Sequence, residues 1–191
     1  DDLSYSITGG DQITATLDGS DVSFSAPANY NGSETFTVSV SDGELADSQS
    51  ITVTVIPVND APVATTGLSG TTAEDQSVVI SLSGSDIDGD ALTFSLSGDA
   101  THGSVVIDGS FATYTPNANY NGDDSFTFSV SDGSLTATAA VTLTVTAVND
   151  APVLAAVDAV SFDEDGSGST TLVGSDIDST DLTYSVSTGT D

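Results

Sequence analysis

Short runs of alternating hydrophobic and polar residues recur along the chain, and this period of two is typical of half-buried β-strands. In residues 61–150 the alternation predicts strands at 78–82, 92–96, 103–107, 111–115, 126–130 and 141–145. A further strand is expected within residues 63–72, which brings the number to about seven. No segment of ten or more residues has a helical period. About seven short strands favour a small β-sandwich, so we predict an all-β fold.

The strand pattern recurs because the chain contains an internal repeat. ANYNG begins at Ala28 and Ala118, VNDAPV at Val58 and Val148, and GSDID at Gly84 and Gly174. The two copies of each motif are separated by 90 residues, which indicates a tandem array of 90-residue units. We therefore expect residues 1–60 to form the C-terminal part of one repeat, residues 61–150 a complete repeat, and residues 151–191 the N-terminal part of a third.

The charge of the chain excludes several classes of function. The 191 residues include 29 acidic residues and no Lys or Arg, so the formal net charge is −29. Nothing can neutralise phosphates, which excludes nucleic acids as partners and disfavours anionic membrane surfaces. No run approaches 18 apolar residues, so no membrane span is expected, and the absence of Cys excludes disulfides and thiolate metal sites. Any carboxylate that leaves water needs a backbone N–H group, a hydroxyl group or a metal cation.

The segment GSDIDGD concentrates three carboxylates, those of Asp86, Asp88 and Asp90. Side chains two positions apart on an extended strand project to the same side, about 6–7 Å apart, and can converge on one ion. Ca²⁺ accepts many oxygen ligands in irregular geometry, whereas transition metals prefer His or Cys. An EF-hand loop is excluded because Ala91 and Ser97 stand where Gly and a bidentate Glu are required. The segment therefore predicts a calcium site of another kind.

Enzymatic activity is not expected. Paired carboxylates can cleave glycosides, but these acidic motifs lie at the junctions of repeats rather than in an apparent cleft. His102 is the only imidazole, and the sequence indicates no Ser–His–Asp arrangement around it.

Four motifs in fixed order connect the chain to a known kind of repeat. VNDAP stands at each junction, AED follows about 14 residues later, and SDIDGDALTFS and FTFSVSDG come next. This order resembles the calcium motifs of cadherin repeats, and more closely the bacterial cadherin-like, NDAPV-type extender repeats of giant secreted RTX-type adhesins. The resemblance covers essentially the whole chain. It implies Greek-key, cadherin-like or Ig-like sandwiches, an extracellular location on a bacterial surface or in the secreted fraction, and Ca²⁺ at each junction.

The resemblance also implies which side chains bind the ion. For the first junction the expected ligands are Glu34, Asn59, Asp60, Asp86, Asp88 and Asp132. For the second junction they are Glu74, Asp124, Asn149, Asp150, Asp176 and Asp178. Asp90 is not counted among them because Thr180 stands at the equivalent position of the third repeat.

We expect a structural extender in which Ca²⁺ stiffens the junctions and neighbouring repeats of the same chain are the partners. Such a segment holds distal binding domains away from the cell in biofilm or host attachment. One alternative is a Ca²⁺-dependent glycan- or protein-binding module, although Tyr30 and Tyr120 lie in repeated motifs and are expected to pack at a strand corner. Another is a filament in which residues 1–60 and 151–191 of different copies complete one sandwich, head to tail, by strand complementation.

Overall fold

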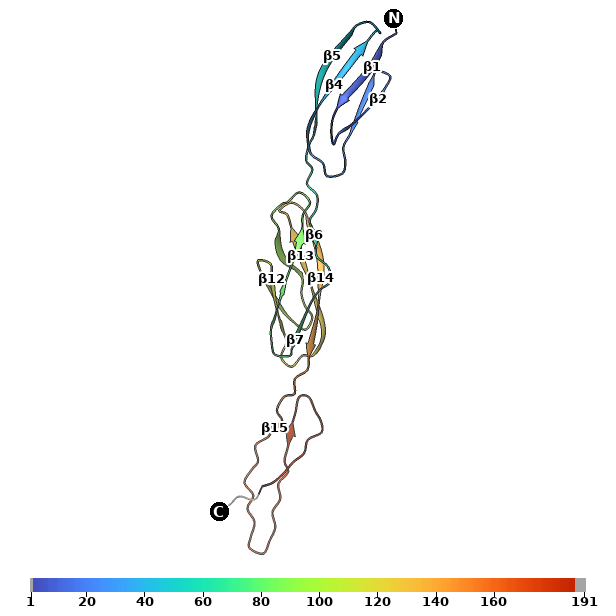
Figure 1. Cartoon of the computed structure of the whole chain (residues 1–191). Helices are drawn as coiled ribbons and strands as arrows, with labels where there is room; N and C mark the ends of the chain where they lie inside the picture. The colour runs from blue at the N-terminus through green and yellow to red at the C-terminus, as the bar shows by residue number, and fades with distance from the viewer. Residues whose placement is uncertain (1, 188–191) are drawn as a thin grey trace. The chain divides into compact units, whose positions relative to one another are not determined.

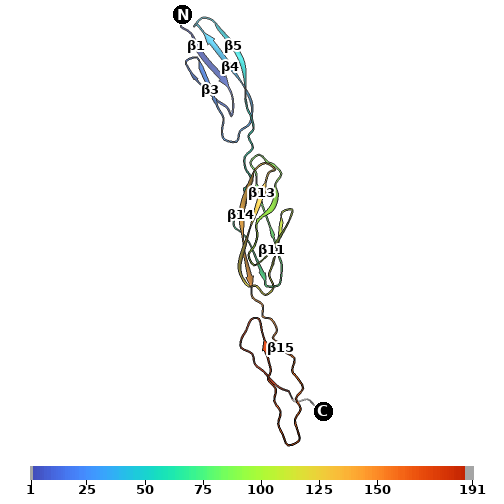
Figure 2. The same ribbon diagram turned by 180° about the vertical axis from the view of Figure 1, so that it is seen from behind.

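The chain is all-β, as the sequence predicted (Figures 1 and 2). The structure is a computed structural model that describes residues 2–187. Within these residues there are sixteen strands and no helix, hence none of the length and apolar character needed to cross a bilayer. The strands are β1 (Ser4–Gly9), β2 (Thr14–Asp18), β3 (Asp21–Ser25), β4 (Gly32–Ser41), β5 (Ala46–Val55), β6 (Val63–Ala64), β7 (Leu68–Ala73), β8 (Val78–Ser81), β9 (Gly84–Ser85), β10 (Thr93–Gly98), β11 (Gly103–Asp108), β12 (Phe111–Pro116), β13 (Gly122–Ser131), β14 (Thr136–Thr146), β15 (Val153–Leu154) and β16 (Gly174–Ser175).

The chain divides into two compact units, which are described separately. The first unit comprises Asp1–Val63, Gly84–Leu92 and Ser131–Ala137. The second comprises Ala64–Ser83, Thr93–Val130 and Thr138–Asp191. Each unit contains one of the two VNDAP linkers together with acidic residues that are distant from it in sequence.

The second unit is built on a β-sandwich of four and three strands. One sheet has the order β10-β13-β14-β7 and the other the order β11-β12-β8. In the first sheet β7 pairs with β14 in parallel, from Val141 opposite Leu68 to Thr146 opposite Ala73. The alternation of β13 and β14 places Phe128 and Val141 inside, where neither is exposed. Removing such side chains from water supplies about 1.5–3 kcal/mol each, so this core is the main source of stability in the unit.

The first unit contains a three-stranded sheet of order β1-β4-β5 and the hairpin β2-β3. Phe36 on β4 is 1 % exposed, and Ile13 is 4 % exposed. The ring of Phe24 packs edge-on against Phe36 with 5.1 Å between centroids, a favoured aromatic geometry. Phe36 is the 90-residue counterpart of the buried Phe126, so the two copies of the repeat use the same core position.

The strand expected within residues 63–72 is divided into β6 and β7. Gly67 lies between them with φ of +77°, a conformation that glycine adopts without cost and that interrupts an extended strand. Before the break, β6 pairs with the short strand β9, which the hydrophobic pattern did not predict. Two-residue strands carry too little alternation to be recognised in a sequence.

Residues 151–187 form only the strand pair β15-β16, the counterpart of β6-β9. Within residues 61–150, β7 pairs with β14, and β8 pairs with β12. Residues 155–173 have no such partner strand among residues 2–187. This explains why their side chains, such as Phe162 at 63 % exposure, remain largely in solvent.

Candidate metal sites

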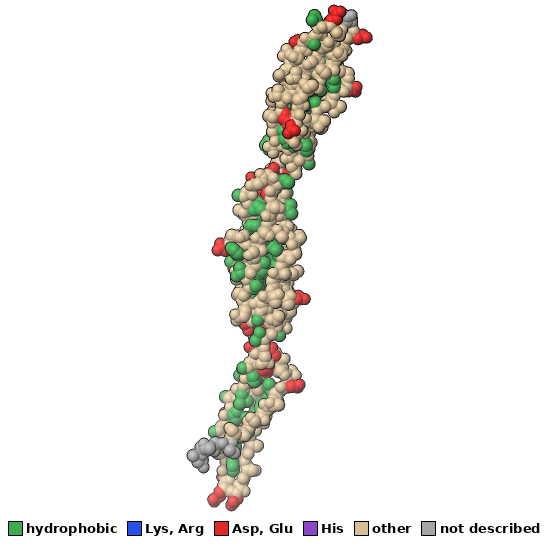
Figure 3. Space-filling view, in the orientation of Figure 1, with side chains coloured by type: hydrophobic (Ala, Val, Ile, Leu, Met, Phe, Trp, Pro, Cys, Tyr) green, Lys and Arg blue, Asp and Glu red, His purple; other side chains and the backbone are tan. Residues whose placement is uncertain are grey.

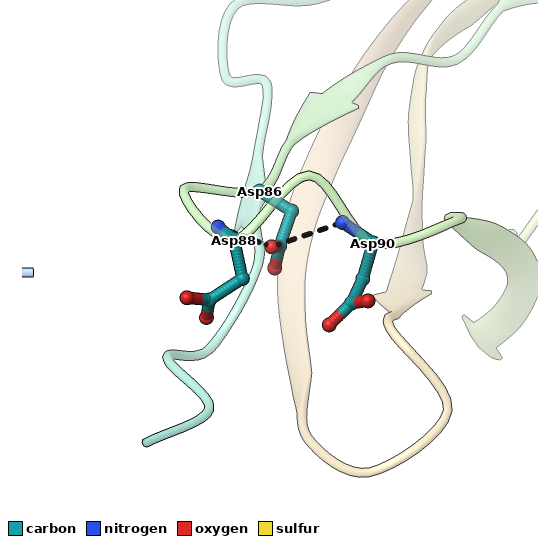
Figure 4. Close-up of side chains that lie close together, drawn as sticks. All are labelled: Asp86, Asp88 and Asp90. Carbon is teal, nitrogen blue, oxygen red and sulfur yellow. Dashed lines mark hydrogen bonds between the residues drawn. The ribbon is translucent and has the colours of Figure 1, made fainter. Parts of the chain in front are cut away.

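The loop that follows β9 carries the three clustered carboxylates of the first unit. One carboxylate oxygen of Asp86 accepts hydrogen bonds from the backbone N–H groups of Asp88, at 2.8 Å, and Asp90, at 3.4 Å. These bonds fold the loop around Asp86 (Figure 4). One oxygen from each of the three side chains lies within 4.8 Å of the others. Because carboxylates repel one another at such distances, the cluster favours a bound cation.

The first VNDAP linker meets this loop. The Asn59 side-chain amide donates to Asp132 Oδ2 at 2.9 Å, and the Asp60 backbone N–H donates to Asp88 Oδ2 at 2.8 Å. The other oxygen of Asp132 accepts two backbone N–H groups of its own turn, from Ser134 and Leu135. The Leu135 N–H, the Asn59 amide and the Ser134 N–H lower the pKa of Asp132, which keeps this carboxylate ionised. Five of the six predicted ligands of this junction are therefore assembled, including Asp86.

The second VNDAP linker has a matching arrangement within the second unit. Glu74 is 3 % exposed and accepts a hydrogen bond from the backbone N–H of Val148. Asp178 accepts the backbone N–H of Asp150, and Asp176 accepts those of Asp178, at 2.9 Å, and Ser179, at 2.8 Å. The Asn149 amide donates to the Asp150 carbonyl at 2.8 Å. Five of the six residues predicted for this junction are thus assembled.

Each cluster contains one buried carboxylate oxygen with no protein donor. Within residues 2–187 these are Asp86 Oδ2 and Asp150 Oδ2. An anionic oxygen removed from water without a partner is unfavourable, and no Lys or Arg exists in the chain to supply one. On the face seen in Figure 3 the charged side chains are accordingly all acidic. The two clusters offer oxygen donors alone, which suits Ca²⁺ better than a transition metal. The residues present therefore fit calcium.

The pKa of Asp150 is also consistent with an unfavourable environment for its negative charge. Burial raises this pKa above its ordinary value, and the nearby charges of Asp178, Asp75, Glu74 and Asp176 raise it further. An acid whose folded-state pKa is raised opposes folding once it ionises. Without a cation, stability should therefore fall as the pH rises from about 4 through the folded-state pKa of Asp150.

Asp150→Asn is accordingly expected to raise the melting temperature in chelator at pH 7, because it removes one charge from the cluster. The same change should weaken Ca²⁺ binding. Thermal unfolding followed by circular dichroism, in EDTA and in Ca²⁺, measures both effects. Asp158→Asn, an exposed position, is the control for loss of one negative charge. Equal melting temperatures for the two variants in EDTA would contradict the prediction.

Glu34 and Asp124 lie elsewhere and have other partners. The Glu34 carboxylate accepts the backbone N–H groups of Asp11, Gln12 and Ile13 at 2.8–3.1 Å, and the Tyr30 hydroxyl at 3.0 Å. The N–H groups of Asp11 and Gln12 contribute most to lowering the pKa of Glu34. The structure thus shows this predicted ligand holding the loop between β1 and β2. Its role in metal binding stays a prediction.

Asp124 repeats this arrangement in the second unit. It accepts the backbone N–H groups of Thr101 and His102 and the hydroxyl of Tyr114, at 2.9–3.0 Å. Burial alone would raise the pKa of Asp124, but the N–H groups of His102, Ser125 and Thr101 and the Tyr114 hydroxyl together lower it. His102 stacks on Tyr120 with centroids 4.2 Å apart, as a packing residue of this loop.

Two further residues near the second linker were not predicted from the sequence. Asp75 contributes to the field at Asp150, and its Oδ1 accepts the backbone N–H of Asn119 at 3.0 Å. Asp75 recurs as Asp165, and Asn119 recurs as Asn29, each 90 residues away. This recurrence could have indicated from the sequence that Asp75 and Asn119 belong to the site. It was not decisive, because Asp and Asn are also common in turns.

The sheets define a protein of tandem Ig-like sandwiches. At each VNDAP linker, carboxylate and amide side chains supply a cluster of oxygen atoms. Residues 1–55 and 59–144 match the family model described as bacterial Ig domain. The chain belongs to the bacterial Ig domain family. No curated protein matches it at a significant level.

Solved structures agree on the fold. A human protocadherin-24 fragment, EC1-2, is 18 % identical over 75 % of this chain and 81 % of that one, with a TM-score of 0.53. An endo-fucoidan hydrolase of glycoside hydrolase family 107 is 25 % identical over 76 % of this chain, with a TM-score of 0.36. The chain spans 24 % of the hydrolase, so no activity follows from that similarity.

Proposed function

We propose that the chain is a calcium-rigidified extender segment of a large bacterial surface adhesin. It acts outside the cell and holds distal binding domains away from the surface in biofilm or host attachment. The observation that carries the proposal is the buried, donor-free oxygen in each linker cluster, Asp86 Oδ2 in one and Asp150 Oδ2 in the other. The two oxygens belong to non-equivalent positions of the repeat, an SDID loop in one cluster and a linker in the other. An unpartnered carboxylate oxygen in each cluster nevertheless favours a cation at every junction over a turn with incidental acids.

Each ion would be held by residues distant from one another in the chain. At the first linker these are Asn59, Asp60, Asp86, Asp88 and Asp132; at the second they are Glu74, Asn149, Asp150, Asp176 and Asp178. A cation shared by the linker and these loops replaces mutual repulsion with attraction, so it limits movement of the linker. The proline that ends each VNDAP linker, Pro62 or Pro152, adds stiffness because its φ is fixed.

Small-angle X-ray scattering with Ca²⁺ and with EDTA tests the proposal. In Ca²⁺ we expect a larger maximum dimension and a higher melting temperature, because loosened linkers let the repeats fold back on one another. A third sample in EDTA, with NaCl raised to the same ionic strength, controls for screening in a chain of charge −29. If Ca²⁺ alters neither quantity beyond the NaCl sample, the chain is not a calcium-rigidified extender.

A further inference from the structure

The turn before the long strand of each repeat contains an asparagine in a left-handed conformation. Asn29, between β3 and β4, has φ of 60°, and Asn119, between β12 and β13, has φ of 57°. Both side chains are exposed. Glycine adopts this conformation at lower cost, although Asn tolerates it better than most residues. Conformation alone therefore does not explain why both repeats keep a side chain here.

The location of these asparagines relative to the linkers is the informative observation. In the first unit Asn29 lines a cavity of about 240 Å³. The same cavity is lined by Asp60 of the linker and by Asp88 of the SDID loop. In the second unit Asn119 lines a cavity of about 630 Å³ together with Asp150 and Asp176. In both units the asparagine thus shares a cavity with the aspartate of the linker and one aspartate of the SDID loop.

The side-chain amides of Asn29 and Asn119 are also free to bind an ion. Within residues 2–187 the amide groups of Asn29 and Asn119 make no hydrogen bond to another protein group. The Asn119 backbone N–H is held by Asp75, which fixes the turn beside Glu74. Amide carbonyl oxygens are ordinary Ca²⁺ ligands, and they add a donor without adding charge to an already repulsive cluster.

We propose that Asn29 and Asn119 each supply a side-chain oxygen to the Ca²⁺ bound at the first and second linker, respectively. The inference rests on the proposed calcium function and extends the ligand set to the turn of the ANYNG motif, which the sequence analysis did not connect with calcium. It assigns the left-handed asparagine a role in recognising a hard divalent cation. The competing interpretation is that this asparagine only forms the turn.

The two interpretations predict different results for Asn29→Gly/Asn119→Gly in the full chain. Glycine preserves the backbone conformation, so the melting temperature in EDTA should be unchanged or higher. If the side chains bind the ion, calorimetry should show Ca²⁺ affinity reduced about tenfold, with a smaller calcium-induced rise in melting temperature. If they only form the turn, Ca²⁺ binding is unchanged, and that result overturns the inference.

Asn29→Asp/Asn119→Asp provides a second, opposite test. An added carboxylate should increase Ca²⁺ affinity, because charge count raises the affinity of calcium sites, and should lower the melting temperature in EDTA by repulsion. Asn117→Ala, an exposed position absent from the cavity lining, is the control and should bind Ca²⁺ normally. An affinity unaltered by the aspartates also counts against the inference. Failure of the unsubstituted chain to bind Ca²⁺ would instead overturn the proposed function.

Discussion

Asp124→Ala is expected to lower the free energy of unfolding of the sandwich in the second unit by about 2–4 kcal/mol. The side chain of Asp124 is 3 % exposed and accepts bonds from two loop N–H groups and from the buried hydroxyl of Tyr114. Alanine leaves these donors without their acceptor. The buried Tyr114 hydroxyl then costs about 1–3 kcal/mol, and the exposed N–H groups of Thr101 and His102 cost less because water can reach them. The loop between β10 and β11 should loosen as well, because Thr101 and His102 lose their anchor.

At low pH, the difference in unfolding free energy between the unsubstituted chain and Asp124→Ala should become smaller. The pKa of Asp124 is lowered in the folded state, so its carboxylate stabilises the fold above the unfolded pKa of about 3.9. That contribution is lost as the pH falls through the lower, folded-state pKa. The unfolding free energies of the unsubstituted chain and Asp124→Ala should therefore converge in strong acid.

Urea denaturation at pH 7 and at lower pH values measures both effects. Asp123→Ala is the matched control, because Asp123 is exposed and its carboxylate accepts a single hydrogen bond from the described residues, from the Thr144 hydroxyl at 3.2 Å. The control should change stability by about 0.5 kcal/mol or less. Similar losses for Asp123→Ala and Asp124→Ala at pH 7 would show that the hydrogen-bond network is not the cause.

The second large effect is expected from Asp86→Ala/Asp176→Ala, which removes the equivalent carboxylate from both linker clusters. At a Ca²⁺ concentration 100-fold above the dissociation constant, each occupied site adds about 2.7 kcal/mol to stability, or about 5 kcal/mol for two sites. The double variant should lose most of this calcium-dependent gain. In EDTA it should lose less, because only the turn bonds within the SDID loops disappear.

Thermal unfolding across a Ca²⁺ titration gives the comparison. Asp18→Ala/Asp108→Ala is the matched control: it removes the same charge from two exposed positions also 90 residues apart, which end β2 and β11 next to their hairpin turns. A calcium-dependent gain that persists in Asp86→Ala/Asp176→Ala would place the ions elsewhere. A gain lost in both double variants would indicate a response to net charge rather than to a site.

The sequence was sufficient to predict strands whose inward positions are regularly apolar. Phe126, Phe128 and Val130 alternate over β13, and their burial follows from the period of two. Because the sequence repeats every 90 residues, the same alternation predicts a strand at β4. The β6-β9 pair was not predictable, because it consists of two-residue strands, and β6 is separated from β7 by Gly67 in a left-handed conformation.

The sequence could indicate which residues of the linkers lie together, because these residues recur with the VNDAP and SDID motifs, whereas their binding of an ion stays a prediction. The partners of Glu34 and Asp124 could not be predicted, since their backbone donors lie 21–23 residues earlier in a different loop. A backbone N–H has no sequence signature, so a carboxylate that binds such groups looks the same in sequence as one that binds an ion.

The anchoring carboxylates also limit how these repeats can be recombined. The second unit uses the shorter Asp124 with the hydroxyl of Tyr114, whereas the first uses the longer Glu34 with the hydroxyl of Tyr30. Phe24 stands at the position equivalent to Tyr114 and has no hydroxyl to donate. When repeats are recombined or shortened, the acid and its tyrosine should therefore be kept together, as Glu34 with Tyr30 or as Asp124 with Tyr114. Exchange of the acid alone would separate it from the hydroxyl that donates to it.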